Sequence, residues 1–414
     1  MNGKKNAILA CLALLLPLVI ISCVSDSQPA AAPSPATNAP KMRGVWVAAI
    51  SSNYPREKTS DARKLKADVD FIVDQCQRFG FNAIFFQARP SCDALYASDI
   101  FPWSQWLCGA EGAAPQDGFD PLAYFCQAAH QKNIALHAWI NPYRIKAKKG
   151  QSLDELLSVR PQMAELKKFI HPSSDGNFYL DPGQPKVREL VVRGAKEILE
   201  KYPVDGLHLD DYFYPQTGID DSDSYKKYGA GMGLDDFRRQ SATLLIKELF
   251  RLTHSARPGA LFGVSPFGIW GNKSSANPYG SATSGTQSYF AHCADSVTWI
   301  QRGIVDYIVP QIYWNIGLKA ADYAELASWW NQAVEGSGVV LYIGMADYKA
   351  AAAIKSGNEK SPWLGTGELK AQLELNKTLK NVSGEVHFNF DSLMEPDIRS
   401  FYEKLANNAF AEYN

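Results

Sequence analysis

The sequence of 414 residues predicts an α/β fold, a (β/α)8 TIM barrel with long βα loops on its C-terminal face. Eight short runs rich in β-branched and aromatic residues alternate with long amphipathic stretches. The short runs are apolar on both faces, which is typical of parallel strands covered by helices. The longest connections follow strands. An open doubly wound sheet is the runner-up, but no glycine-rich dinucleotide fingerprint follows the first strand.

The expected elements follow one another as strand and helix along the chain. Strands are predicted at residues 43–50, 82–90, 134–143, 204–212, 261–267, 305–314, 339–345 and 385–391. Helices are predicted at residues 58–79, 121–131, 187–201, 235–255, 323–334 and 367–381. Eight βα units over about 370 residues agree with a barrel that carries insertions, since the plain form takes about 250.

Four long connections follow the second to fifth predicted strands, at residues 91–118, 144–184, 215–233 and 268–283. In a barrel these connections lie at the C-terminal face, where barrel enzymes keep their active sites. We therefore expect them to form the walls of a cleft suited to an extended ligand.

The first 40 residues are predicted to be a secretory signal peptide followed by a flexible tether. Lys4 and Lys5 precede an apolar run that is too short to span a bilayer comfortably and has the layout of a secretory signal. Ile20-Ile21-Ser22-Cys23 resembles a bacterial lipobox, so we expect a signal peptide over residues 1–22 and lipidation of Cys23. Residues 23–40 are predicted to be a flexible tether and residues 41–414 the catalytic domain. Val24, where an inner-membrane signal usually has Asp, favours the outer membrane.

Net charge and cysteine content indicate which binding partners and which cysteine pairings are expected. A net charge of -1 gives no electrostatic reason to expect nucleic acid, and the lipid anchor is the only membrane contact expected. Beyond Cys11 and Cys23, five cysteines remain, which cannot all pair. A Cys92–Cys108 bridge and five buried thiols are both compatible with the sequence, and no C-x-x-C spacing indicates a metal ribbon.

Strand alternation sorts inward from outward side chains. In the fourth strand Leu207 and Leu209 belong against the helices, so His208, Asp210 and Tyr212 face the barrel. Asp210 is then expected at the C-terminal end of the strand, with Asp211 beside it. A pair of Asp residues at this point indicates function, because buried charges are costly without a task or a partner.

The same test applied to the other strands yields a polar set suited to sugar hydroxyls. Its members are Gln87, Arg89, His137, Trp139, Asn141, Gln311, Tyr313, Trp314, His387, Asn389 and Asp391. Glycoside hydrolysis normally needs two carboxyl groups. Asp210 is the best placed, and the second is open among Asp391, Asp347 and Asp211. No Glu stands at the end of the fourth or seventh strand, where the large retaining β-glycosidases keep theirs. No cofactor and no metal is expected.

Longer motifs carry a family resemblance. They are Arg43-Gly44-Val45-Trp46, Phe86-Gln87-Ala88-Arg89, Trp139-Ile140-Asn141-Pro142-Tyr143, Leu180-Asp181-Pro182-Gly183, the run from Asp205 to Pro215, Ser265-Pro266-Phe267-Gly268-Ile269-Trp270 and Pro310-Gln311-Ile312-Tyr313-Trp314. Together they resemble the glycosyl hydrolase-like 10 family of exported bacterial barrels, over residues 41 to 395. The resemblance implies a hydrolase of cell-envelope or polysaccharide glycans and adds Arg43, Trp46 and Trp270 to the expected substrate contacts.

The fourth strand is also similar, more weakly, to that of family 18 chitinases. Asp205-Gly206 matches and Asp210 falls on the second Asp of their Asp-x-Asp-x-Glu series, but His208 and Tyr212 replace the other acidic positions. The missing Glu puts a chitinase-type acid in doubt. On a substrate with N-acetyl groups, such as peptidoglycan, the acetamide itself is an alternative participant, oriented by Asp210 or Asp211.

Two other function classes stay open. A barrel that lost its chemistry would be a glycan-binding lipoprotein, and the unsettled second carboxylate is the feature that keeps this alternative. A metal-dependent hydrolase such as a deacetylase would use His137, His208, His387 and Asp210 as a zinc site. No tight His spacing supports that site.

Overall fold

The computed structural model describes residues 41–50, 53–146, 150–211, 213–215 and 218–412. The predicted signal peptide, Cys23 and the tether lie outside the described residues, so these predictions stay untested.

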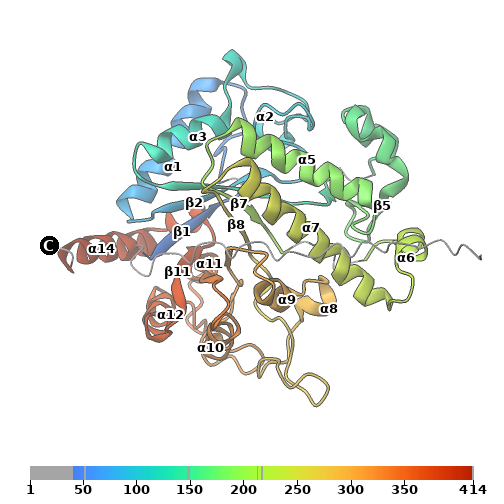
Figure 1. Cartoon of the computed structure of the whole chain (residues 1–414). Helices are drawn as coiled ribbons and strands as arrows, with labels where there is room; N and C mark the ends of the chain where they lie inside the picture. The colour runs from blue at the N-terminus through green and yellow to red at the C-terminus, as the bar shows by residue number, and fades with distance from the viewer. Residues whose placement is uncertain (1–40, 51–52, 147–149, 212, 216–217, 413–414) are drawn as a thin grey trace, which may run out of the picture. The chain divides into compact units, whose positions relative to one another are not determined.

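Eight parallel strands close into a barrel in the order β1-β11-β10-β9-β8-β7-β3-β2, with helices around it (Figure 1). The predicted fold class is confirmed. The barrel strands are β1 Met42–Val47, β2 Ala83–Arg89, β3 Ala135–Ile140, β7 Gly206–Leu209, β8 Leu261–Val264, β9 Tyr307–Ile308, β10 Val340–Met345 and β11 Val382–His387. Several are shorter than predicted because the chain leaves the sheet early at the C-terminal face, where the functional side chains stand.

Helices follow the strands as expected. The six predicted helices correspond to α1 Ala62–Arg78, α3 Pro121–His130, α5 Pro185–Lys201, α7 Leu234–Ala256, α10 Tyr323–Ala333 and α12 Gly367–Thr378. The sequence analysis did not predict α2 Gln105–Cys108, η1 Gln116–Gly118, α4 Leu153–Ser158, η2 Pro161–Phe169, α6 Ser222–Tyr228, α8 Ser288–Ala291, α9 Ser296–Gln301, α11 Asp347–Ser356, α13 Phe390–Leu393 and α14 Pro396–Glu412. Five of them, α2, η1, α4, η2 and α6, lie inside the long connections after the second to fourth predicted strands.

Local capping chemistry explains where the main helices begin. The Asp61 side chain accepts a hydrogen bond from the backbone of Arg63 at the start of α1, and Asp120 accepts one from Ala123 at the start of α3. Pro121 occupies the first position of α3, where a missing N–H costs nothing.

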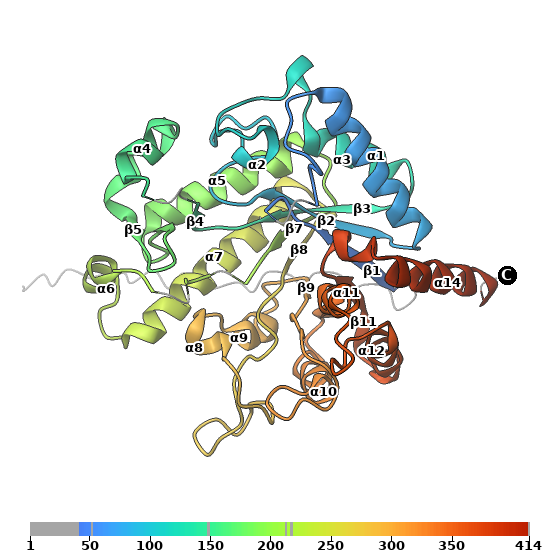
Figure 2. The same cartoon turned by 180° about the vertical axis from the view of Figure 1, so that it is seen from behind.

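The connection between β3 and α5 folds into a separate small sheet. Its strands β4 Arg144–Ile145, β5 Ile170–Pro172 and β6 Phe178–Leu180 pair antiparallel in the order β4-β6-β5. In both views this excursion, with α4, lies on the same side of the barrel as α6, and α14 lies on the opposite side (Figure 2). The loops after β3 and β7 therefore lie on the same side of the barrel.

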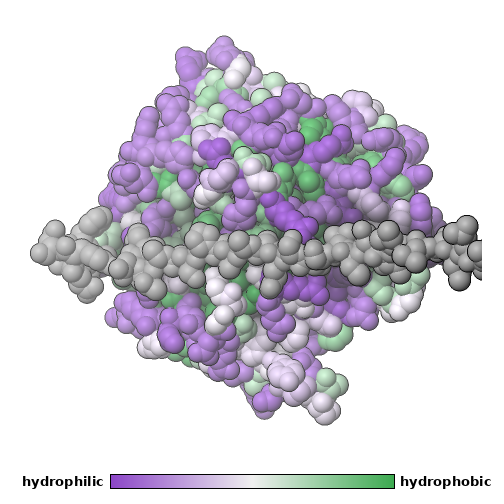
Figure 3. Space-filling model, in the orientation of Figure 1, coloured by the Kyte–Doolittle hydropathy of each residue, from purple (hydrophilic) through white to green (hydrophobic). Residues whose placement is uncertain are grey.

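Two apolar cores hold the barrel. The larger lies between the strands and the surrounding helices, and the smaller fills the barrel around Trp46, Phe85 and Tyr307. Small inward residues make room for large ones, since a Cβ at Gly206 would lie 2.2 Å from Nδ1 of His137. Hydrophilic residues cover most of the face drawn in Figure 3.

Strand irregularities correct two of the alternation predictions. The register of β2 shifts between Gln87 and Arg89, so Arg89 turns outward beside Phe101 instead of into the barrel. The register of β11 against β10 also shifts, and here Val386 packs inside the barrel. His387 consequently faces outward, against Tyr402 of α14.

The remaining cysteines are all free thiols: Cys76, Cys92, Cys108, Cys126 and Cys293. The Cys92–Cys108 bridge is therefore wrong, and the alternative of five buried thiols holds for four of them, since Cys108 is half-buried. Within the described ranges, no helix combines the length and the apolar character needed to cross a bilayer.

Candidate active site

A cleft of about 270 Å³ opens at the C-terminal ends of the strands. Two carboxyl groups, one cation and several aromatic rings surround it. The lining residues are Trp46, Ala48, Ile50, Gln87, Trp139, Arg144, Asp210, Asp211, Gln311, Tyr313, Tyr348 and Phe388. The cleft thus combines flat apolar faces with convergent polar groups, as ligand sites do.

Asp210, directly after β7, is buried and held by three donors. Nδ2 of Asn141 donates to its Oδ2 at 3.0 Å, and Nε2 of Gln311 donates to its Oδ1 at 3.3 Å. The backbone N–H of Asp211 donates to Oδ1 at 2.8 Å. Gln87 in turn donates to Oδ1 of Asn141 at 2.9 Å, which fixes the orientation of that amide. These donors hold the carboxyl group of Asp210 in one fixed position.

Asp211 lies in the opposite electrostatic environment. Burial of its carboxyl group raises its pKa well above the usual value, and the charge and hydrogen bond of Asp210 raise it further. Arg144 acts in the other direction, lowering the pKa. Two adjacent carboxyl groups with such different surroundings can serve as a proton donor and an anion at the same pH.

Below the cleft, a hydrogen-bonded chain crosses the barrel interior. Nε1 of Trp46 donates to Nε2 of His208 at 3.3 Å. Because an indole N–H can only donate, Nε2 of His208 is the acceptor. Nδ1 of His208 then donates to the hydroxyl of Tyr307 at 3.2 Å, and that hydroxyl donates to Nδ1 of His137 at 2.9 Å. Burial lowers the pKa of His137 to about 4 and that of His208 well below its usual value. Both imidazole rings are therefore neutral, and their hydrogen bonds stabilise the barrel interior below the cleft.

Aromatic rings form the walls. Trp139 and Trp46 stand on β3 and β1, and Tyr313, Tyr348 and Phe388 follow β9, β10 and β11. The Phe388 ring lies 6.0 Å from the rings of Trp46 and Tyr313. Burial raises the pKa of Tyr313 well above its usual value, so its hydroxyl stays a neutral donor. Apolar faces of this kind can stack against sugar rings.

Seven of the predicted site residues that the structure describes line this cleft: Asp210, Asp211, Trp46, Gln87, Trp139, Gln311 and Tyr313. Asn141, His137 and His208 lie directly behind it through the hydrogen bonds above. Tyr212 lies outside the described residues.

Several other predicted residues are placed elsewhere. Arg43 is exposed at the N-terminal end of β1, where its Nε donates to the carbonyl of Gly80 at 2.5 Å. Asp347 opens α11 and is bound by Tyr402 at 2.6 Å and His387 at 3.0 Å. Neither residue lines the cleft. Arg43 lies at the opposite, N-terminal end of the barrel, and the carboxyl group of Asp347 is bound by Tyr402 and His387.

The remaining four likewise do not line the cleft. Asp391 is exposed on α13, and Asn389 caps that helix by accepting from the backbone N–H of Ser392 at 3.4 Å. Both lie beyond the end of β11, where strand alternation no longer applies. Trp270 stacks on Trp329, and Trp314 packs against Phe267. These two rings hold loops together.

Alternation missed Arg144, Tyr348, Phe388, Ala48 and Ile50 among the lining residues. Arg144 directly follows the third predicted strand, three residues after Asn141. The sequence did contain a signal for Arg144: it is a cation directly after a strand whose inward-facing residues are polar.

The predicted zinc set is not brought together. His137 and His208 share Tyr307 inside the barrel, whereas His387 lies outside it beside Tyr402. Among the described residues, no group of three or more His, Cys, Asp or Glu side chains has the arrangement of a metal site.

Comparison with known proteins agrees with this architecture. Residues 41–363 match the glycosyl hydrolase-like 10 family. The chain is 37% identical to glycosyl hydrolase DigH of Escherichia coli strain K12, over 95% of this chain and 94% of that protein. It is also 37% identical to glycosyl hydrolase YngK of Bacillus subtilis strain 168, over 85% of this chain and 69% of that protein.

Solved structures with the same fold are more distant in sequence. The PgaB (BpsB) glycoside hydrolase domain from Bordetella bronchiseptica superposes with a TM-score of 0.55 at 11% identity, over 88% of this chain and 98% of that one. Alpha-L-fucosidase isoenzyme 2 from Paenibacillus thiaminolyticus gives 0.51 at 14% identity, over 90% and 49%. The chain belongs to the glycosyl hydrolase-like 10 family and is a glycoside hydrolase built on a (β/α)8 barrel.

Proposed function

We propose that this glycosidase cleaves O-glycosidic bonds in a polysaccharide of the bacterial cell envelope, with peptidoglycan glycan strands as the substrate. The observation that carries the proposal is the Asp210–Asp211 pair, in which one carboxyl group is held by three donors and its neighbour has a raised pKa. The two carboxyl groups give the cleft both a base and an acid.

In this mechanism Asp211 donates its proton to the glycosidic oxygen as the bond from the anomeric carbon to the leaving sugar breaks. A water molecule then bonds to the anomeric carbon and gives up a proton to Asp211, which restores the acid. Asp210 remains anionic and stabilises the positive charge that develops on the sugar ring. The aromatic walls hold the ring, and Gln87, Asn141 and Gln311 keep Asp210 in position. General acid–base catalysis of this kind contributes roughly 10²–10⁴ in rate.

The substrate's own acetamide is a second participant in the proposal. Among the described residues that line the cleft, Asp210 and Asp211 are the only carboxyl groups, and they are adjacent. Enzymes that use two carboxyl groups on opposite sides of the bond separate them by about 5 Å or more. An N-acetyl carbonyl can occupy the place of the missing group, with Asp210 oriented toward the amide N–H. Peptidoglycan sugars carry this group.

Location supports the choice of an envelope glycan. The lipobox-like segment ending at Cys23 and the outer-membrane preference from Val24 are sequence arguments. A lipid-anchored enzyme at the outer membrane reaches the glycan layer beneath it. If Cys23 carries the anchor, Cys23→Ser should move the protein from the membrane fraction to the soluble fraction of cells.

The test of function is release of reducing ends by the purified protein. Purified peptidoglycan, peptide-free glycan strands and a panel of plant and host polysaccharides are compared, with Asp210→Asn and Asp211→Asn as inactive variants. Asp235→Asn, at an exposed position of α7, is the matched control. Release from glycan strands by the wild type and the control alone supports the proposal.

Binding of glycan strands without release by the folded wild type would favour the glycan-binding lipoprotein instead. Release from another polysaccharide only would keep the carboxylate chemistry and reject peptidoglycan as the substrate.

A further inference from the structure

The guanidinium of Arg89 is fully buried on the outer side of β2. Within the described part of the chain, its Nε, Nη1 and Nη2 have no hydrogen-bond acceptor, and it forms no ion pair. A buried charge without a partner is strongly unfavourable, so each such group requires an explanation.

The surroundings of Arg89 are tight and largely apolar. Its guanidinium carbon lies 4.8 Å from the centre of the Phe101 ring, which compensates the charge in part but leaves the N–H groups unbonded. On α5, a Cβ at Gly194 would lie 2.6 Å from Nη1 and 2.5 Å from the Phe101 ring. The helix thus has a glycine where it passes the guanidinium.

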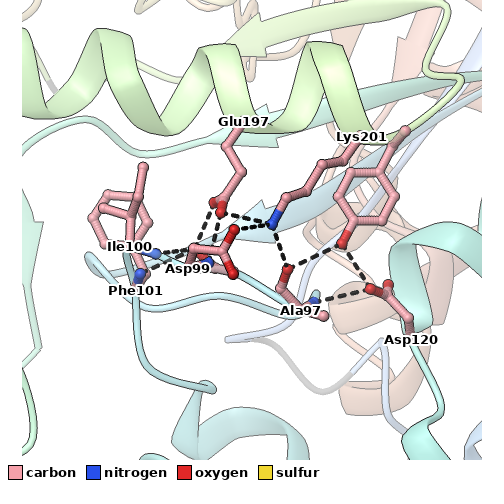
Figure 4. Close-up of polar contacts among 9 residues, drawn as sticks. Ala97, Asp99, Ile100, Phe101, Asp120, Glu197 and Lys201 are labelled. Atoms are coloured by element: carbon pink, nitrogen blue, oxygen red, sulfur yellow. Dashed lines mark hydrogen bonds and ion pairs between the residues drawn. The ribbon is translucent and has the colours of Figure 1, made fainter.

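The neighbouring carboxylates are bound elsewhere (Figure 4). Glu197 of α5 accepts from the Ser98 hydroxyl at 2.5 Å, from the Asp99 backbone at 2.6 Å and from Nζ of Lys201 at 3.1 Å. Figure 4 shows Glu197 and Lys201 reaching from the helix to the segment that ends at Phe101. Asp93 accepts from the Ser104 hydroxyl and the Ser91 backbone. Neither carboxylate neutralises Arg89.

We propose that Arg89 binds a small monovalent anion, chloride in the cell, between β2 and α5. A halide accepts several hydrogen bonds, requires no acceptor in return and supplies the missing negative charge. Water would satisfy N–H groups but leave the charge unbalanced. Larger anions such as phosphate do not suit a site bounded by Phe101 and the bare backbone at Gly194.

The site is connected to the cleft through the main chain. The carbonyl of Arg89 accepts from the backbone N–H of Asn141 at 2.9 Å, and the Asn141 side chain holds Asp210. The anion therefore stabilises the strand end that positions Asp210.

Bromide, which scatters anomalously, is the direct probe. Crystals of the wild type soaked in sodium bromide should give an anomalous peak at the Arg89 guanidinium. Ordered water there and no bromide would overturn the proposal.

The matching solution measurement is the melting temperature in sodium chloride against sodium gluconate at equal ionic strength. We expect the wild type to melt about 3 °C higher in chloride, because an anion bound only by the folded state stabilises it. Arg89→Met should lose this difference, and Arg302→Met, at an exposed position, should keep it. A bromide peak with no chloride dependence of the wild type would mean an adventitious ion only, and an equal dependence in Arg89→Met would equally contradict the site.

Discussion

The two ends of the barrel treat their carboxylates differently. At the N-terminal end, Asp205 accepts from the backbone of Leu136 at 2.7 Å and pairs with His130 at 2.8 Å. Asp306 repeats the arrangement two strands further, with the backbone of Phe262 at 2.7 Å and His254 at 3.1 Å. Each side chain ties the start of one strand to its neighbour and to the end of a helix.

At the C-terminal end, Asp210 and Asp211 share a cleft, and the hydrogen bonds of Asp210 come from side-chain and backbone amides instead of from a histidine. Amide donors position Asp210, and burial raises the pKa of Asp211. The carboxylates at the N-terminal end hold the barrel together, whereas the pair at the C-terminal end lines the cleft, where it can act on a ligand. Position along the strand separates structure from chemistry in this fold.

Removing one carboxylate at each end of the barrel tests most directly whether the C-terminal end serves catalysis and the N-terminal end serves stability. Asp210→Asn or Asp211→Asn is expected to lower kcat by roughly 10²–10⁴-fold with the melting temperature unchanged or raised. Asp205→Asn should instead lower the melting temperature and leave kcat near the wild-type value. Reducing-end release and thermal unfolding measured on the same samples decide between them. Similar activity losses at both ends would reject the division.

The free energy of unfolding should depend on pH in the acid range because the buried imidazole of His137 is neutral in the folded protein. Because burial lowers the pKa of His137 to about 4, the unfolded chain binds a proton that the folded chain refuses as the pH falls below about 6.5. The free energy of unfolding should thus decrease between pH 6.5 and 4, by at most about 3 kcal/mol from this residue. Denaturant unfolding at several pH values measures the loss.

His137→Gln keeps an acceptor for the Tyr307 hydroxyl and should flatten this acid slope. His171→Gln, on the small sheet, is the control and should leave the slope unchanged. An identical acid slope in His137→Gln would mean that other groups account for the acid loss.

How far the sequence predicted this site depends on strand regularity. In β7 the leucines at 207 and 209 marked the outer face, and His208 and Asp210 were correctly expected inside. The same rule gave Gln87, Trp139, Asn141 and Gln311. An unbroken alternation along a strand was sufficient, because one face must pack against helices.

The rule failed where the strand was irregular or already over. A register shift turned Arg89 outward, and another inverted His387 and Phe388. Asp347 and Asp391 belong to short helices that begin just after their strands. A bulge is one extra residue and leaves no mark in the alternation of a single sequence, so these positions required the structure.

Arg144 offers a finer test of the cleft pair. Its charge lowers the pKa of Asp211, so Arg144→Gln should raise that pKa further. If Asp211 must be protonated to act, kcat/KM declines as the pH rises through its pKa. The alkaline limb of the pH profile should therefore move to higher pH in Arg144→Gln. A limb that moves to lower pH, or disappears with Asp211 intact, would argue against Asp211 as the acid.

The smallest expected effect lies at the N-terminal end, where His254 has the opposite sign to His137. The hydrogen bond to Asp306 raises the pKa of His254 despite partial burial. Its contribution is fully present below the unfolded pKa of about 6.5 and is lost as the pH rises through the folded value. His254→Gln should be less stable than the wild type at pH 5.5 by less than about 1 kcal/mol, since the pair is partly exposed to solvent. The difference should shrink by pH 9, and a deficit that stays constant across this range would mean that packing, not the ion pair, carries the contribution of His254.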